Sequence, residues 1–241
     1  MQFSDTEVER LNKQFEDAPA EEVLKWTLDN LHPKVGLATS FQFQGMVLID
    51  MLMKIDSGAR IFTLDTGRLN KETYDVIEEV MNKYDTIVEI IFPDKNEVEE
   101  MVNKHGINLF YRSVADRRMC CNIRKTRPLN DYLKSLDGWI TSIRRDQTTN
   151  RASAKKFEVD YLHGRILKVN PIVDWTTKHV WDYIDENNVP YNKLHDIGYP
   201  SIGCAPCTRP VRPGEDPRSG RWWWETESDK ECGIHFDYDS K

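Results

Sequence analysis

VGLATSFQFQGMVLIDMLMKI, residues 35–55, is the stretch from which the fold class of this chain follows. The run Val35 to Thr39 is short, largely apolar and partly β-branched, and it predicts a buried strand. The polar loop Ser40 to Gly45 comes next, and the apolar residues from about Met46 predict a helix. A strand, a short loop and a helix in this order are the building unit of α/β sheets.

The same order of elements recurs along the chain. Further strands are predicted within residues 59–65, 86–92, 138–145 and 165–173, and helices within residues 70–83, 95–106 and 176–188. Strands that alternate with helices through short joins form parallel sheets, and right-handed crossovers bring all the strand ends to one edge. We therefore predict an α/β fold with a parallel sheet and helices on both of its faces.

Two helices are predicted at the N-terminus, over residues 5–15 and 20–31, and the second ends before His32-Pro33. From Val189 onward, proline and glycine become more frequent and the regular periodicity fades. We expect a single domain over residues 1–241, with an α/β core to about residue 188 and an irregular C-terminal segment over about 189–241.

The composition excludes several classes of protein. Of the 241 residues, 39% are hydrophobic and 30% are charged, and the net charge is −7. No apolar run approaches the roughly 20 residues of a membrane span, and the N-terminus lacks the apolar region of a signal peptide. The acidic balance argues against nucleic-acid binding. An odd number of cysteines without an export signal predicts a cytoplasmic location.

Five cysteines form an adjacent pair, a C-x-x-C and a singleton. They are Cys120 and Cys121, Cys204 and Cys207, and Cys232. Four thiolates in two local groups suit a zinc ion or an iron–sulfur cluster, although buried free cysteines are an alternative. For both cysteines of the adjacent pair to bind one metal centre, the pair must lie in a turn or at the start of a helix. We predict that this pair lies just before a helix over residues 124–136. If the four are ligands, Cys232 remains available for chemistry.

Positive charge gathers near these cysteines although the chain is acidic. The cations are Arg117, Arg118, Arg124, Lys125 and Arg127 around the pair, Arg144, Arg145 and Arg151 after the next predicted strand, and Arg209, Arg212, Arg218 and Arg221 after the C-x-x-C. Each run alone is typical of a solvated surface. Together they indicate a site for a small, highly charged anion.

Two loops and one aromatic run are further candidates. The loop Ser40 to Gly45 precedes a helix, where α/β proteins bind phosphate, but it matches neither glycine-rich phosphate-binding pattern. Ser40 is thus a phosphate contact or an ordinary helix cap. Asp65 either orients a ribose or a basic residue, or caps a turn. We interpret Trp222 to Trp224 as a hydrophobic anchor for the C-terminal segment rather than a stacking platform.

An ordered set of motifs resembles the assimilatory adenylylsulfate (APS) reductases, the iron–sulfur branch of the PAPS/APS reductase family. The motifs are LDTG at 64–67, CCxxRK at 120–125, IRRDQ at 143–147, YPSIGC at 199–204, GCAPCT at 203–208, GRWW at 220–223 and ECGIH at 231–235. The resemblance extends from about residue 35 to the end of the chain.

The resemblance implies a Rossmann-like fold akin to the adenine nucleotide alpha hydrolases, and the reduction of APS to sulfite and AMP in sulfate assimilation. It implies a [4Fe–4S] cluster on Cys120, Cys121, Cys204 and Cys207, and electrons from thioredoxin or a glutaredoxin-like dithiol. Carried over by position, the catalytic residues are Cys232 and His235, with an S-sulfocysteine forming on Cys232. The residues that would meet the phosphosulfate are Arg124 or Lys125, one or both of Arg144 and Arg145, Arg218 and Arg221, with Ser40 near the phosphate. We add Asp65 to these substrate-binding candidates because it ends a predicted strand. We also expect a homo-oligomer.

One motif departs from the family, and alternatives remain. The family loop usually has the sequence Ser-Phe-Gly-Ala-Glu-Asp, whereas residues 40–45 are Ser-Phe-Gln-Phe-Gln-Gly. The principal alternative is reduction of the 3′-phosphorylated nucleotide PAPS, or of both nucleotides. A tRNA-thiolating ATP pyrophosphatase is less favoured, because its Gly-Gly turn and Asp-Ser are missing. A zinc-binding protein without catalytic activity would leave Cys232 and the arginine runs unexplained.

Overall fold

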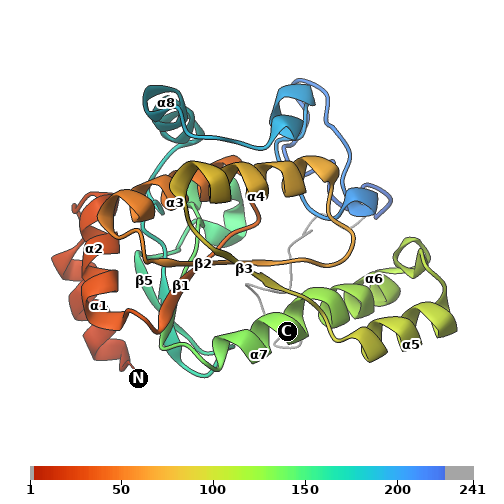
Figure 1. The fold of residues 1–241 in the computed structure, drawn as a ribbon, viewed down its shortest axis with the longest axis horizontal. Coiled ribbons are helices and arrows are strands. Elements are labelled where there is room, and N and C mark those ends of the chain that lie inside the picture. The colour runs from red at the N-terminus through yellow and green to blue at the C-terminus, as the bar shows by residue number, and fades with distance from the viewer. Residues whose placement is uncertain (1–2, 226–241) are drawn as a thin grey trace. The chain divides into compact units, whose positions relative to one another are not determined.

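The computed structural model describes residues 3–225 of the protein (Figure 1). The chain divides into two compact units. The first, here the sheet unit, comprises residues 1–63, 75–89 and 133–192, and the second, here the cysteine unit, comprises residues 64–74, 90–132 and 193–241. The single domain with a C-terminal segment from about residue 189 stays a prediction.

Six strands form one sheet, in the order β3-β2-β1-β4-β6-β5. They are β1 (Val35–Ala38), β2 (Arg60–Leu64), β3 (Val88–Ile91), β4 (Gly138–Ile140), β5 (Phe157–Asp160) and β6 (Ile166–Val169). β1 pairs in parallel with β2 and β4, and β4 pairs in parallel with β6. The predicted α/β class with a mainly parallel sheet is confirmed.

The edge strand β5 was not expected, and it runs antiparallel to β6. A tight hairpin joins the two strands, in which Gly164 and Arg165 both have positive φ angles, 80° and 64°. The Arg165 amide donates to the Asp160 carbonyl at 2.8 Å and closes the turn. Because the prediction assumed a helix between successive strands, it passed over this hairpin.

Nine regular helices accompany the strands among the described residues. They are α1 (Asp5–Gln14), α2 (Ala20–Leu31), α3 (Phe43–Ile55), α4 (Lys71–Tyr84), α5 (Lys95–His105), α6 (Val114–Cys121), the π-helix η2 (Asn122–Thr126), α7 (Arg127–Leu133) and α8 (Thr177–Asn187). Short 3₁₀ turns are η1 (Leu109–Tyr111), η3 (Arg145–Gln147), η4 (Thr149–Arg151), η5 (Lys193–Ile197) and η6 (Ala205–Cys207). None of these described helices is both long and apolar enough to cross a membrane.

Helix α3 begins at Phe43, three residues before its predicted start. Phe41 before it is fully buried and has a φ of 54°, and its amide donates to Thr39 Oγ1 at 3.1 Å. A Cβ atom at Gly45 would lie 2.5 Å from the same Thr39 oxygen. Only glycine therefore fits at position 45 in the first turn of α3. The helix includes residues 43–45, which the sequence suggested to be part of the loop.

The cysteine pair lies at the end of a helix, not at a turn or a helix start. Ser113 caps α6 by accepting a hydrogen bond from the Asp116 amide at 3.0 Å, and α6 ends at Cys121. The helical turn then widens into the π-helix η2, which leads directly into α7. Pro128 has no N–H to donate back into this turn, which favours the irregularity. The prediction missed α6 because its charged sequence has no apolar period.

A buried carboxylate joins the helices of the sheet unit. Asp50 on α3 is 2% exposed and accepts hydrogen bonds from Tyr84 on α4 at 2.9 Å and Tyr183 on α8 at 2.8 Å. Lys54 lies 2.6 Å from the same carboxylate. Burial and the Asp50 charge raise the pKa of both tyrosines, so their hydroxyls remain donors.

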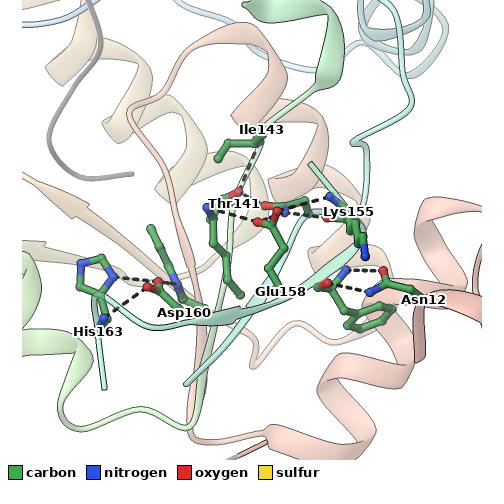
Figure 2. Close-up of polar contacts among 11 residues, drawn as sticks. Asn12, Thr141, Ile143, Lys155, Glu158, Asp160 and His163 are labelled. Carbon is green, nitrogen blue, oxygen red and sulfur yellow. Dashed lines mark hydrogen bonds and ion pairs between the residues drawn. The ribbon is translucent and has the colours of Figure 1, made fainter. Parts of the chain in front are cut away.

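Side chains also secure the edge strand β5, as Figure 2 shows. The Asn12 amide group on α1 donates to the Phe157 carbonyl at 2.8 Å and accepts from the Phe157 amide at 3.0 Å. At the far end of β5, Asp160 accepts from Trp139 Nε1 at 2.8 Å and pairs with His163 at 2.7 Å. Helix α1 thus takes the place of a further strand at this edge.

We predict that Asn12→Ala lowers the free energy of unfolding by roughly 1–3 kcal/mol, because two hydrogen bonds to the backbone of β5 are lost. Urea denaturation followed by circular dichroism measures the change. Asn30→Ala is the matched control, since the exposed Asn30 amide bonds only within its own helix, to the Trp26 carbonyl. Equal losses in the two variants would contradict a role of Asn12 at the sheet edge.

Candidate active site

Three described cysteines of the cysteine unit lie at one apolar cluster. Its buried members are Met101, Leu109, Phe110, Cys207 and Trp222, and Cys120 and Cys204 pack against it. Cys120 and Cys121 come from the last turn of α6. Cys204 immediately precedes η6, and Cys207 is the last residue of η6. None of these four described cysteines is in a disulfide. Two separate parts of the sequence thus bring thiols to one cluster.

Backbone hydrogen bonds fix the C-x-x-C turn. The Ala205 amide donates to the Arg68 carbonyl at 2.8 Å, and the Asn70 side chain donates to the Gly203 carbonyl at 3.1 Å. Tyr111 donates its hydroxyl to the Pro206 carbonyl at 2.7 Å. The turn is therefore held from both sides, by the segment that follows β2 and by η1.

Cations and a hydroxyl group surround the Cys204 sulfur. Burial opposes ionisation of this thiol, but Lys125, the Thr66 hydroxyl at 3.2 Å, and Arg221 and Arg124 together hold the pKa of Cys204 below its usual value. Cys207 behaves in the opposite way, since burial and the nearby Cys204 charge raise the pKa of its thiol to about 12. Burial also raises the pKa of Cys120.

The chemistry of this donor set fits a thiolate-bound metal group. Four cysteines without disulfides lie in one unit, and cations lower the cost of at least one thiolate. Within residues 3–225, however, no three Cys, His, Asp or Glu side chains are arranged at metal-binding distance. The ligand set Cys120, Cys121, Cys204 and Cys207 is thus compatible with the structure in its chemistry and remains a prediction in its geometry.

Two of the predicted anion-binding arginines are buried beside the cysteines. Arg124 is 9% exposed and donates from Nη1 to the Thr66 carbonyl at 2.6 Å. Arg221 is 6% exposed, donates to the Ile202 carbonyl at 3.2 Å, and lies over the Trp222 ring. Carbonyl oxygens thus orient both guanidinium groups. Lys125 and Arg218 are partly buried in the same unit.

Asp65 serves its own turn in this structure. It is 5% exposed, accepts from the Gly67 amide at 2.7 Å, and accepts from the Tyr74 hydroxyl at 3.0 Å. Burial and this carboxylate raise the pKa of Tyr74 to about 12. Of the two roles expected for Asp65, these contacts match the capping of a turn.

Three predicted substrate-binding residues belong to the sheet unit. Ser40 accepts a hydrogen bond from the Gln42 amide group at 2.8 Å, just before α3. Arg144 is 2% exposed and follows β4 closely. Arg145 donates from Nε to the Ala154 carbonyl at 2.8 Å. The predicted catalytic residues Cys232 and His235 lie outside the described residues.

The sequence did not single out two contacts that build the site. One is the Thr66 hydroxyl at the Cys204 sulfur, for which the turn Thr66-Gly67 was the only signal. The other is the ion pair between Arg117 and Glu225, with oxygen–nitrogen distances of 2.8 and 2.9 Å and side chains 4% and 3% exposed. Arg117 also lies 4.4 Å from the centre of the Trp222 ring.

The aromatic run is largely an anchor. Trp222 is 2% exposed within the apolar cluster, and Trp224 packs against that cluster. Trp223 is 43% exposed, and Arg209 lies 5.2 Å from the centre of its ring. The interpretation of this run as a hydrophobic anchor therefore agrees with Trp222 and Trp224, but not with Trp223.

Comparison with known proteins gives consistent matches. Residues 34–210 match the family described as the phosphoadenosine phosphosulfate reductase domain. The chain is 46% identical over 205 residues to the adenosine 5′-phosphosulfate reductase of Burkholderia cepacia, covering 85% of this chain and 82% of that protein. It is 43% identical over 218 residues to the enzyme of the same name from Neisseria meningitidis serogroup B, covering 89% and 88%.

Solved structures agree on the fold. The phosphoadenylyl-sulfate (PAPS) reductase from Candida auris, in a phosphate complex, superposes with a TM-score of 0.75 at 29% identity, covering 88% of this chain and 99% of that one. The FMN adenylyltransferase of Candida glabrata, with FAD and pyrophosphate, gives a TM-score of 0.54 at 13% identity, covering 98% and 81%. The second match shows a shared fold only.

We predict that Glu225→Ala lowers the free energy of unfolding of the protein by about 3–5 kcal/mol, because it leaves the buried Arg117 charge without its partner. Glu97→Ala is the matched control, since Glu97 pairs with Arg127 at an exposed position, where a loss of about 0–1 kcal/mol is expected. Guanidinium denaturation of both variants measures the difference. Similar losses would show that Arg117 finds compensation elsewhere.

Proposed function

This chain belongs to the phosphoadenosine phosphosulfate reductase family, and we propose that it reduces adenosine 5′-phosphosulfate (APS) to sulfite and AMP in sulfate assimilation. The observation that carries the proposal is its similarity to relatives named adenosine 5′-phosphosulfate reductase, which extends over more than four fifths of both chains. The enzyme is an oxidoreductase that acts on a sulfur group.

APS is favoured over PAPS as the substrate. The relatives at 40–46% identity over most of this chain are named for APS, whereas the Candida auris structure named for PAPS is 29% identical. The two cysteine pairs support the same choice, because PAPS-specific members of the family typically lack them.

The substrate is an anion with poor reactivity toward another anion. Oxygens of the sulfate group repel a thiolate, so cations must neutralise them before sulfur can be attacked. We assign this role to Arg124, Lys125, Arg218 and Arg221. Arg124 and Arg221 suit it because both are buried beside Cys204, where their charge favours its thiolate, and carbonyl groups hold them in place.

The sheet unit supplies the other proposed contacts. Ser40 and the first turn of α3 lie where a phosphate group binds in α/β folds. Arg144 and Arg145 follow β4 and are assigned to the phosphosulfate. In the cysteine unit, Asp65 shapes the turn after β2.

We assign a [4Fe–4S] cluster to Cys120, Cys121, Cys204 and Cys207. When bound to these residues, a cluster would adjust the charge near the sulfate group rather than pass electrons, because thiols already balance the reaction. The residues beside Cys204 make defined contacts in the structure. Thr66 contacts the Cys204 sulfur, and Lys125, Arg124 and Arg221 favour its thiolate form.

The chemical steps use Cys232. Its thiolate attacks the sulfur of APS, the sulfur–oxygen bond to phosphate breaks, and AMP leaves, giving S-sulfocysteine. A thiolate of a thioredoxin- or glutaredoxin-like partner then attacks the Cys232 sulfur and releases sulfite. The second thiol of the partner resolves the mixed disulfide, so the dithiol is oxidised by two electrons. His235 assists the reaction or positions the C-terminal residues. A homo-oligomeric state and a cytoplasmic location remain predictions from the sequence.

We predict that the protein releases sulfite from APS when reduced thioredoxin is supplied, and that Cys232→Ser lowers kcat at least ~10³-fold because the nucleophile is lost. Sulfite release from APS and from PAPS is measured side by side. Mass spectrometry after incubation with APS alone should find an added SO₃ on the peptide that contains Cys232. Turnover by the variant, or faster turnover of PAPS, would contradict the corresponding assignment.

A second prediction concerns the cluster ligands. Cys121→Ser is expected to lose most of the bound iron and acid-labile sulfide, because one of four thiolate ligands is missing. Iron, zinc and sulfide are measured in the purified proteins, and Cys232→Ser is the control that retains them. Zinc without sulfide in the unaltered protein would identify a zinc site instead.

A further inference from the structure

The first residue of α3 carries an unexpected stack of side chains. The Phe43 ring lies parallel to the Trp181 ring of α8, with 5.0 Å between the ring centres and 5° between their planes. The guanidinium group of Arg144 lies over Phe43, 5.4 Å from the centre of its ring. All three residues belong to the sheet unit. An aromatic residue at position 43 is a feature of this chain, since the usual family loop has alanine there.

Arg144 is held firmly but is incompletely bonded. Its Nε donates to Asp146 at 2.9 Å, and its Nη2 donates to the Thr177 hydroxyl of α8 at 2.8 Å. The side chain is 2% exposed, and its Nη1 has no hydrogen-bond partner among residues 3–225. A buried donor without an acceptor is unfavourable, so its position requires a compensating ligand or a functional reason.

Helix α8 supports both sides of this arrangement. Thr177 is its first residue and Trp181 stands one turn later, so they lie on the same face of the helix. The two residues therefore fix the guanidinium group and the ring beneath it together. A flat aromatic ring under a guanidinium group favours its positive charge and limits its tilt.

The start of α3, whose first side chain lies under Arg144, carries backbone donors of its own. Gln42 at the cap position makes no side-chain cap hydrogen bond to this helix, and its amide group donates to Ser40 instead. The first backbone N–H groups of a helix attract anions, and Arg144 lies over the first residue of α3. The unpartnered Nη1 and the helix start can thus serve one anionic group.

We propose that Phe43 is a positioning residue for the reaction: backed by Trp181, it holds Arg144 so that Nη1 donates to the anionic phosphosulfate end of the substrate. This inference rests on the proposed function. Phe43 itself makes no polar contact with substrate in this assignment. Its effect passes through the orientation of Arg144, and this distinguishes it from a residue that only stabilises the fold.

The test is a double-mutant cycle on the full chain in the Cys232→Ser background, without a thiol donor, in which the dissociation constant for APS is measured by calorimetry. Phe43→Ala is expected to weaken APS binding about tenfold, or ~1.4 kcal/mol. Combined with Arg144→Ala, it should weaken binding no further than Arg144→Ala alone. Phe43→Tyr, which keeps the ring, should bind APS within about twofold of the background protein.

Phe15→Ala is the matched control. Phe15 is a buried aromatic residue of the same unit that packs on Trp26 and Phe157. It should lower Tm and leave APS affinity unchanged. If Arg144→Ala fails to fold, Arg144→Lys takes its place in the cycle, and the effect of Phe43→Ala should again shrink.

Each result has a defined meaning. Independent, multiplying effects of Phe43→Ala and Arg144→Ala would overturn the inference, as would an equal loss of affinity in Phe15→Ala. Coupling of the two residues in a protein that binds APS but releases no sulfite from it would uphold the inference and overturn the proposed function. Failure of the background protein to bind APS would overturn both.

Discussion

Burial of positive charge beside thiols is the constraint on which the cysteine unit depends. Arg124 and Arg221 are almost inaccessible to water, and they donate hydrogen bonds to the Thr66 and Ile202 carbonyls and to the Ser201 hydroxyl. Arg117 is equally buried, but Glu225 neutralises it. The unit thus contains arginines of two kinds: one locks the aromatic anchor to α6, and the others maintain a positive potential around the sulfur atoms. This division explains how an acidic chain can present a site for an anion.

The sheet unit follows a related logic at the start of α3. Backbone geometry there leaves helical N–H groups uncapped, and α8 provides the framework that orients a buried guanidinium group. The carboxylate of Asp50 ties the same two helices together through Tyr183. Stability and binding are therefore coupled in α3, because one helix is both the centre of the core and the edge of the proposed site.

Much of the sheet could be predicted from the sequence, because buried parallel strands and the helices between them have distinct periods. The hairpin of β5 could not, since its strand is only Phe157–Asp160 and its partner follows without a helix. The helix α6 was missed for a different reason: charged residues dominate it, and tertiary contacts such as Arg117 with Glu225 stabilise it. The candidate cations were found by their clustering. Their roles depend on which neighbour each contacts, and sequence spacing does not specify that.

The close approach of Gly45 to Thr39 also bears on how this loop can change over generations. A side chain introduced at position 45 would collide with the Thr39 hydroxyl. A residue without a hydroxyl at position 39 would remove the oxygen that accepts a hydrogen bond from the Phe41 amide. A substitution at either position alone would therefore disturb the connection between β1 and α3. The two positions are therefore coupled, and a substitution at one calls for a compensating substitution at the other.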